Sequence, residues 1–258
     1  MADNPAARAA AWLERSLGYR FEDPRLLDEA LTHRSAAGQS NERLEFLGDA
    51  VLDFVISHAV YTRRPDAPEG DLSRLRASLV NDRALAELAG ELGIGEHLQL
   101  GSGEKKTGGH RRSSILADAL EALFGAVYLD RGFAAAEQLI REVYAGRLAA
   151  LPDSESLKDP KTRLQERLQA DGLPLPDYAV TDVSGKPHRR RFAVVCRVPA
   201  LELERAGEGG SRRAAEQAAA TALLDALRGA TGRRTRTGSR SAAAASPWSG
   251  ARTSASRR

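Results

Sequence analysis

Residues 41–53 carry four acidic side chains within an apolar segment: Glu42, Glu45, Asp49 and Asp53. At about 100° per residue, a helix places these four side chains within about 80° of one another. Three large apolar residues flank this acidic stripe and favour a partly buried groove: Phe46, Leu52 and Ile56. Carboxylates that share such a groove repel one another and need protons, bases or a metal ion. Because a solvated amphipathic helix has the same spacing, the pattern alone leaves both interpretations open.

A second acidic pair lies in the apolar segment 115–128, where Asp118 and Glu121 are three residues apart and share one helix face. Small residues nearby, Ala122 and Gly125, would allow this helix to approach a neighbour closely. Two facing helices would bring together four carboxylates: Glu45, Asp49, Asp118 and Glu121. Such an all-oxygen site suits Mg²⁺ or Mn²⁺. Its chemistry would be phosphodiester hydrolysis, because a bound metal ion generates a nucleophilic water and stabilises the reacting oxygens.

The composition is that of a globular protein, with 42% hydrophobic and 28% charged residues among 258. No apolar run approaches the roughly 18–20 residues of a membrane span, and the first sixteen residues lack the apolar core of a secretory signal. The single cysteine, Cys196, excludes an internal disulfide and a cysteine-based zinc site. We therefore expect a cytoplasmic protein with no membrane partner.

The net charge of +3 is unevenly distributed along the chain. Residues 1–158 sum to −6, residues 159–225 to +1, and residues 226–258 to +8. The first part therefore cannot attract a polyanion by its bulk charge, whereas bound cations would let it accept a phosphate backbone. The basic end of the chain could attract nucleic acid or an anionic membrane without specificity.

The sequence predicts two domains, 5–152 and 159–228, joined by a linker at 153–158. The first has helical periodicity in five segments and no sustained alternation, so we expect a mainly α fold: 7–17, 24–34, 41–63, 71–92 and 115–130. Residues 229–258 are rich in Gly, Ser, Ala, Thr and Arg without a hydrophobic period, which predicts a disordered basic tail.

The second domain is predicted to run helix, three strands, helix. Asp159 and Pro160 have the residue types that begin a helix, and Gly172 is typical of a helix end. Apolar and polar residues then alternate in 178–181, 192–198 and 201–203. An alanine-rich helix is expected from near Ser211 to Gly229.

At this point the residues resemble a known family. The segment Asn41–Asp49 (NERLEFLGD) is similar, without a mismatch, to the nine-residue motif of the ribonuclease III family. Four other blocks agree with it: Leu17–Phe21, Leu31–Ser35, Gly101–Glu104 and Ile115–Tyr128. The resemblance covers residues 12–228 in the bacterial arrangement, a helical nuclease domain followed by a double-stranded-RNA-binding domain.

The resemblance implies a Mg²⁺-dependent endonuclease for double-stranded RNA, in which Mn²⁺ substitutes. Products would carry 5′-phosphate and 3′-hydroxyl ends with short 3′ overhangs, and substrates would include ribosomal and other structured RNA precursors. Residue by residue, it gives metal binding to Glu45, Asp49, Asp118 and Glu121. Asp49 and Glu121 would be catalytic, and Glu42 would have a supporting role.

The resemblance also implies a homodimer in which each subunit contributes one centre and each centre cuts one strand. Gly48 supports this indirectly, because a glycine within a helix costs about 1 kcal/mol relative to alanine and is tolerated where a close-packing partner needs the space. Asp53 departs from the family pattern, and is either a solvated bystander, which we favour, or an outer partner of metal-bound water.

Residues 159–228 resemble the double-stranded-RNA-binding domain. A-form RNA hides its base edges, so proteins contact its 2′-hydroxyls and phosphates. We expect three residues of the first helix to face hydroxyls: Thr162, Gln165 and Glu166. His188 lies where the family inserts a histidine into the minor groove, and Arg212 and Arg213 begin the last helix, where donors converge on phosphate. Glu216 replaces a third base found in many relatives, which weakens this clamp.

Taken singly, these RNA-binding candidates and the neighbouring run Arg189–Arg191 are ordinary surface residues. Two alternatives from other classes also compete. A catalytically silent duplex-RNA-binding regulator is disfavoured by the intact acidic cluster. A metal phosphohydrolase of nucleotides is disfavoured by the RNA-binding part. No small-molecule cofactor is expected, because His110 breaks the phosphate-loop pattern after Gly109.

Overall fold

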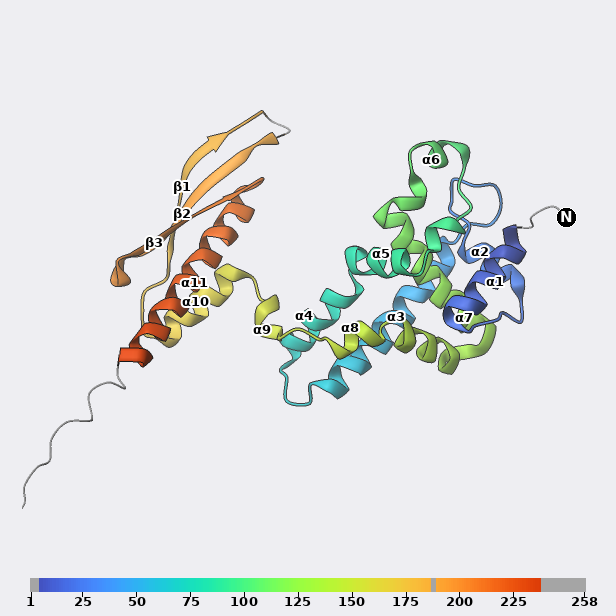
Figure 1. The fold of residues 1–258 in the computed structure, drawn as a ribbon, viewed down its shortest axis with the longest axis horizontal. Coiled ribbons are helices and arrows are strands. Elements are labelled where there is room, and N and C mark those ends of the chain that lie inside the picture. The colour runs from blue at the N-terminus through green and yellow to red at the C-terminus, as the bar shows by residue number, and fades with distance from the viewer. Residues whose placement is uncertain (1–4, 187–188, 238–258) are drawn as a thin grey trace, which may run out of the picture. The chain divides into compact units, whose positions relative to one another are not determined.

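The polypeptide is divided into two units, Met1–Leu157 and Lys158–Arg258, in the computed structural model. The structure describes residues 5–186 and 189–237, with side chains up to residue 228. The mainly α class is confirmed, since three strands in the second unit accompany helices in both (Figure 1). Among the described residues, no helix is both long and apolar enough to cross a bilayer.

Among the described residues of the first unit, the regular elements are helices and helical turns, and Thr32 and Gln99 form an isolated parallel bridge between loops. Its helices are α1 (Pro5–Leu17), α2 (Pro24–Ala30), α3 (Glu42–Arg63), α4 (Glu69–Val80), α5 (Asp82–Glu91), α6 (Ser102–Lys106), α7 (Ser113–Val143), α8 (Ala145–Ala149) and α9 (Ser154–Leu157), with short 3₁₀ turns η1 (Ile94–Glu96) and η2 (Gly109–Arg111). The apolar residues of these helices form one core, in which Phe124 and Tyr144 are among the largest fully buried side chains.

Local sequence signals explain several helix ends. The Asp23 carboxylate accepts a hydrogen bond from the Arg25 backbone N–H, and Pro24 follows in the first turn of α2. The predicted helix 71–92 is instead two helices, because Asn81 has an extended backbone and its side chain accepts a hydrogen bond from the Ala84 N–H. The long helix α7 bends at Gly132, where φ is +77° and the absence of a Cβ matters.

The second unit contains α10 (Pro160–Ala170), β1 (Asp177–Ser184), β2 (Arg191–Val198), η4 (Pro199–Leu201), β3 (Leu203–Gly209) and α11 (Arg212–Thr237). The sheet is antiparallel in the order β1-β2-β3. Helices α10 and α11 lie side by side, and α11 packs against β2 and β3 (Figure 1). Their shared core includes Leu164, Cys196 and Leu223, so Cys196 is buried as expected for a core residue.

The predicted start of α10 is confirmed, since the Asp159 side chain accepts a hydrogen bond from the Lys161 N–H and Pro160 follows it. Leu201 belongs to the turn η4 rather than to the third strand, which begins at Leu203. Helix α11 continues to Thr237, past the predicted end at Gly229. A glycine lowers helix propensity by about 1 kcal/mol without by itself ending a helix. Residues 238–258 of the predicted tail lie outside the described residues.

Candidate functional site

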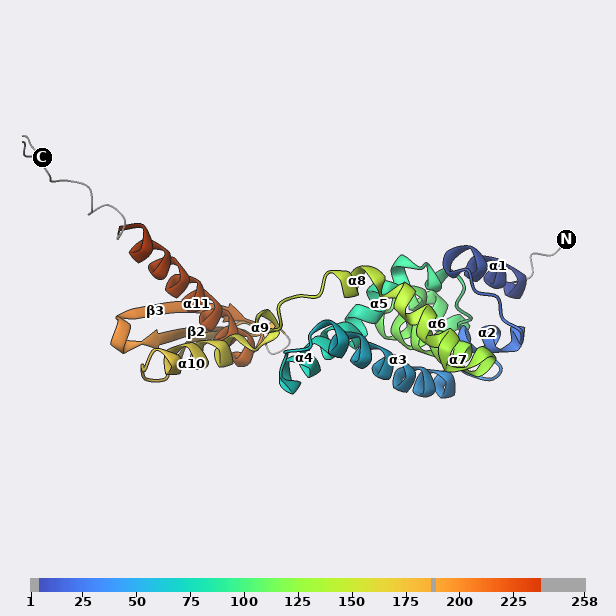
Figure 2. The ribbon, with the colours of Figure 1, turned by 90° about the horizontal axis from the view of Figure 1, so that it is seen from below.

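Two glycines bring α3 and α7 into close contact. A Cβ on Gly48 would lie 1.8 Å from the carbonyl oxygen of Glu121, and one on Gly125 would lie 2.2 Å from the carbonyl oxygen of Leu44. The two helices run beside each other in both views (Figures 1 and 2). The predicted role of Gly125 in close approach is confirmed. Gly48 as support for a dimer is wrong, because the partner that needs its space is α7 of the same chain.

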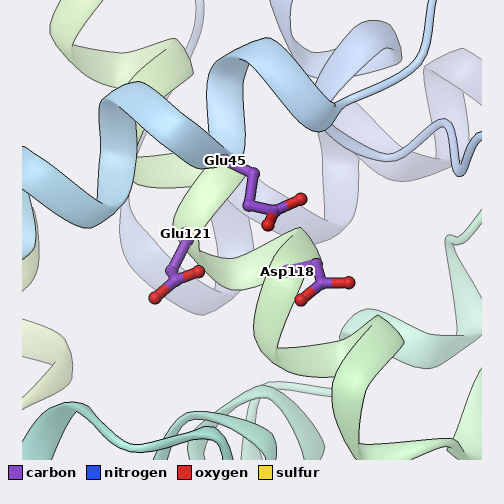
Figure 3. Close-up of side chains that lie close together, drawn as sticks. All are labelled: Glu45, Asp118 and Glu121. Carbon is purple, nitrogen blue, oxygen red and sulfur yellow. The ribbon is translucent and has the colours of Figure 1, made fainter.

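This crossing places three carboxylates together. Glu45 of α3 and Asp118 and Glu121 of α7 offer oxygen atoms that all lie within 4.8 Å of one another. Their side chains project into the same space from two helices (Figure 3). All three are half-buried, which sets them apart from the solvated acids of an ordinary amphipathic helix. The arrangement could hold a metal ion, since oxygen is the donor that hard divalent cations prefer.

The protonation of Glu121 reflects this crowding. Burial raises the pKa of Glu121 to about 8, and the charge of Asp49, followed by Glu45, Asp118 and Asp82, adds to the increase. Burial also raises the pKa of Glu45, and the charges of Asp118, Glu42 and Asp49 act in the same direction. The pKa of Asp118 is raised for the same reason, burial first and the charge of Asp82 second. The cluster therefore favours bound protons or a cation.

Asp49 lies beside this group without being a member of it. It stands four residues after Glu45, a rise of about 6 Å along α3, and the group of three mutually close carboxylates does not include it. Its charge nevertheless raises the pKa of Glu121 more than any other charge does. Burial raises the pKa of Asp49 itself, and Asp53, one turn further along, adds to this. Of the four predicted carboxylates, three converge and the fourth approaches from the next turn.

The outer rim of the cluster contains residues that the motif did not single out. Arg34 lies 3.6 Å from the Glu42 carboxylate, and its charge lowers the pKa of Glu45 and Asp118 against the effect of burial. His33 acts on Asp118 in the same direction. Asp82, in the first turn of α5, adds a further negative charge. An acid in the first turn of a helix is common, so Asp82 carried no signal in the sequence.

The side chains predicted for RNA hydroxyls are exposed on one helix. Thr162, Gln165 and Glu166 all belong to α10 and face solvent. Glu166 accepts a hydrogen bond from Lys158 Nζ at 2.7 Å, which occupies one of its oxygens. His188, predicted for the minor groove, lies outside the described residues.

The basic side chains at the start of α11 are paired with acids of their own unit. Arg212 donates from Nε to Glu216 at 2.9 Å, and Lys161 Nζ donates to the other Glu216 oxygen at 2.5 Å. Arg213 lies 3.6 Å from Asp159, whose side chain also accepts a hydrogen bond from Gln217 at 2.7 Å. These bonds join the first turns of α10 and α11. The guanidinium groups predicted to bind phosphate therefore already have carboxylate partners.

Comparison with known families finds a match in each of the two units. Residues 23–148 match the model of a ribonuclease-III-like domain, and residues 160–227 match the double-stranded RNA binding motif. The chain belongs to the ribonuclease III family. The ribonuclease thus pairs a nuclease domain with a domain for double-stranded RNA, and its family identifies it as an endoribonuclease.

Several relatives resemble this ribonuclease over most of their length. "Ribonuclease 3" of Alkalilimnicola ehrlichii is 59% identical over 215 residues, covering 83% of this chain and 94% of that protein. "Ribonuclease 3" of Pseudomonas fluorescens is 56% identical over 217 residues, covering 84% of this chain and 95% of that protein. A solved nuclease domain of ribonuclease III from Campylobacter jejuni superposes with a TM-score of 0.50 and 45% identity, covering 52% of this chain and 97% of that one. That structure is described as containing a region involved in dimer formation.

Proposed function

We propose that the ribonuclease cleaves double-stranded RNA at the acidic cluster of α3 and α7, with Mg²⁺ as its metal ion and Mn²⁺ as a substitute. Glu45, Asp118 and Glu121 would hold the ion, because their oxygens lie within 4.8 Å of one another. Asp49 would complete the site from the next turn, and Glu42 would support it from the rim. The observation that carries the proposal is this convergence of half-buried carboxylates whose pKa values all remain raised.

The protein supplies the carboxylate oxygens that would bind the ion and holds them in position. It also contributes Glu121, which binds and releases a proton. A divalent cation bound there would lower the pKa of a coordinated water and stabilise negative charge on the phosphate. Glu121 is largely protonated near neutral pH in the metal-free protein, since its pKa is about 8. It must lose that proton to become a ligand, so cation affinity should rise with pH. We assign the catalytic roles to Asp49 and Glu121, as the resemblance to the family implies. The charge of Asp49 raises the pKa of Glu121 more than any other charge does.

A cleavage assay tests this proposal. Purified protein with Mg²⁺ should cut a long RNA duplex, spare the equivalent DNA duplex, and lose activity in EDTA. Glu121→Ala should abolish cutting while RNA binding in EDTA stays within a few-fold of the original. A Glu121→Ala protein that cuts at the normal rate would refute the assignment of the site. Duplex binding by the original protein without any cutting would instead support a silent regulator.

The finer properties of the reaction follow from the family and are proposed with it. Each cut would leave a 5′-phosphate and a 3′-hydroxyl, with a short 3′ overhang from paired cuts. Ribosomal and other structured RNA precursors in the cytoplasm would be the substrates. On the second unit, Thr162, Gln165, Glu166 and His188 would contact the minor groove, and Arg212 and Arg213 would contact phosphate.

We also propose that two copies form a homodimer through one face of α3 and α7. Phe46, Phe54 and Tyr61 of α3 are exposed to 80%, 60% and 68%, and their positions fall within about 80° of one another on the helix. From α7, Leu129 is 54% exposed, and the Phe133 ring meets the Phe54 ring at 5.4 Å, edge to face. Large apolar side chains exposed together on one face of a protein mark interaction surfaces.

Analytical ultracentrifugation tests the dimer. The original protein should sediment as a dimer, and Phe46→Glu combined with Phe54→Glu should convert it to a monomer. Leu175→Glu is a matched control, because Leu175 is 52% exposed in the other unit. A monomer in the original protein, or a dimer that survives both charged substitutions, would contradict this surface as the interface.

A further inference from the structure

The residue that precedes α3 is polar and buried. Asn41 is only 2% exposed, whereas the next residue, Glu42, is exposed. An asparagine just before a helix typically accepts a hydrogen bond from a backbone N–H of the first turn. Among the described residues, the Asn41 side chain accepts no such bond. Its Nδ2 instead donates to the carbonyl of Ala30, in another helix, at 3.3 Å. The side chain therefore forms a contact between two helices and does not cap its own helix.

Asn41 joins the end of α2 to the start of α3 through three hydrogen bonds. Ala30 is the last residue of α2 and is fully buried, and the last carbonyls of a helix have no partner within it. The Asn41 amide supplies a partner for the Ala30 carbonyl. The backbone N–H of Asn41 donates to the Thr32 carbonyl at 2.9 Å, and its own carbonyl accepts from the Glu45 N–H at 2.8 Å. One buried residue is thus bonded to α2, to the turn after it, and to Glu45.

The turn that Asn41 contacts is held by further tertiary bonds. Thr32 is 4% exposed, and its hydroxyl donates to the Asp28 carbonyl of α2 at 2.6 Å. Thr32 also forms a parallel bridge with Gln99, a residue far away in the sequence. The hydrogen bonds of Asn41 therefore connect the start of α3 to a part of the nuclease unit that is itself fixed.

Glu45 needs such an anchor because of its place in α3. It lies in the first turn, and helix ends open more readily than helix centres because their backbone groups lack partners within the helix. The crossing at Gly48 brings α3 against α7. Glycines, however, provide no side chains that interdigitate, the feature that fixes how packed helices lie on one another. Asn41 fixes α3 from its end, one turn before Glu45.

We propose that Asn41 is a positioning residue for the cleavage reaction. Its buried hydrogen bonds hold the first turn of α3, and with it the Glu45 carboxylate, within reach of the two acids of α7. Asn41 acts through Glu45, since its side-chain amide is bonded to α2 and not to the acidic cluster. The inference rests on the proposed metal site and adds the residue that keeps one of its ligands in place. Loss of Asn41 should therefore weaken metal binding although every ligand remains.

Uptake of Mn²⁺ without RNA tests the inference. Asn41→Ala should raise the dissociation constant of Mn²⁺ at pH 8 at least fivefold. Thr32→Val is the matched control, because it removes another buried hydrogen bond to α2 and leaves the backbone bond between Thr32 and Asn41. Both substitutions should lower the melting temperature by a similar amount, since each removes one buried hydrogen bond. Thr32→Val should nevertheless change the dissociation constant less than twofold. Equal weakening in the two variants, or none in Asn41→Ala, would overturn the inference.

Hydrogen exchange in the original protein provides a second test that needs no variant. The amides of Glu45 in α3 and Leu72 in α4 are equivalent, because each donates to the carbonyl of the residue that precedes its helix. Both residues are half-buried, and neither helix has a side-chain cap within the described part of the chain. The residue before α4, Pro68, is exposed, whereas Asn41 is buried.

The protection factor of the Glu45 amide should therefore exceed that of the Leu72 amide at least tenfold. Equal protection of the two amides would overturn the inference, even if the Asn41→Ala protein does not fold. A failure of the original protein to take up Mn²⁺ would instead overturn the proposed function.

Discussion

The acidic cluster of the nuclease unit and the charged network at the start of α11 shift the pKa values of their carboxylates in opposite directions. At the crossing of α3 and α7, burial and neighbouring acids raise the pKa of Glu121. At the start of α11, Glu216 is only 8% exposed, yet hydrogen bonds from Lys161 and Arg212 lower its pKa. Among the described residues, no cation pairs directly with the carboxylates of Glu45, Asp118 and Glu121, whereas Lys161 and Arg212 both contact Glu216.

This difference distinguishes a site suited to binding a ligand from a network of interactions that stabilises the fold. Charges that are satisfied within the chain stabilise the folded state directly, as around Glu216. Charges that repel one another destabilise the free protein and are relieved only when a cation or proton arrives.

The largest expected effect is on cleavage. Glu121→Gln keeps the shape of the side chain but removes the charge, so cleavage of an RNA duplex should fall by roughly 10²-fold or more, the range for groups that act in the chemical step. Asp53→Asn, on the same face of α3, is the control and should stay within a few-fold, as expected for a bystander. Single-turnover kinetics with Mg²⁺ measure both. Equal losses in the two variants would move Asp53 into the site.

The next effect is on stability, at the crossing that positions the acids. Gly48→Ala would place a Cβ 1.8 Å from the Glu121 carbonyl oxygen, so the helices must separate. Overpacking of this kind costs about 1–3 kcal/mol. The melting temperature should fall by about 4–10 °C for a unit of this size. Gly90→Ala, in α5 with nothing within 4 Å, should leave stability unchanged or raise it slightly. A Gly48→Ala protein that melts normally would disprove the close contact.

A smaller loss is expected in the second unit. Glu216→Gln removes the charge that accepts hydrogen bonds from Lys161 and Arg212, which should cost about 1–2 kcal/mol at neutral pH. Because the folded-state pKa of Glu216 is lowered, this contribution is present above the unfolded pKa and is lost as pH falls through the folded one. Unfolding by urea at pH 7 and pH 4 measures it. Equal free energies of unfolding for the Glu216→Gln variant and the original protein at pH 7 would contradict a structural role for Glu216.

The smallest expected effect is a gain in stability of the metal-free protein. The pKa of Glu121 is raised from 4.5 to about 8, so the folded metal-free protein binds more protons than the unfolded chain between these values. Its stability should therefore decrease as pH rises from 5 to 8. Glu121→Gln should reduce this slope and stabilise the metal-free protein at pH 8 by about 1 kcal/mol. Thermal melts in EDTA check this. If the substitution leaves the dependence of stability on pH unchanged, burial and neighbouring acids do not raise the pKa of Glu121.

Most of the architecture was accessible from the sequence, because helical period, alternating strands and capping residues act locally. Asp159 with Pro160 marked the start of α10, and the small residue Gly125 indicated a close helix crossing. The sequence pattern alone could not show which residue each glycine or charged side chain contacts. Gly48 packs within its own chain, and Arg212 is neutralised by Glu216, because tertiary contacts decide both. Asp82 comes from a separate helix, so no spacing within a motif could indicate it.

Binding of Mn²⁺ tests the central claim most directly. The electron paramagnetic resonance signal of free Mn²⁺ reports uptake by the protein without any cleavage. The original protein should bind the ion more tightly at pH 8 than at pH 6, and Glu121→Gln should weaken binding at pH 8 by at least tenfold, while Asp53→Asn should not. No uptake by the original protein at either pH, with or without duplex RNA, would contradict the account.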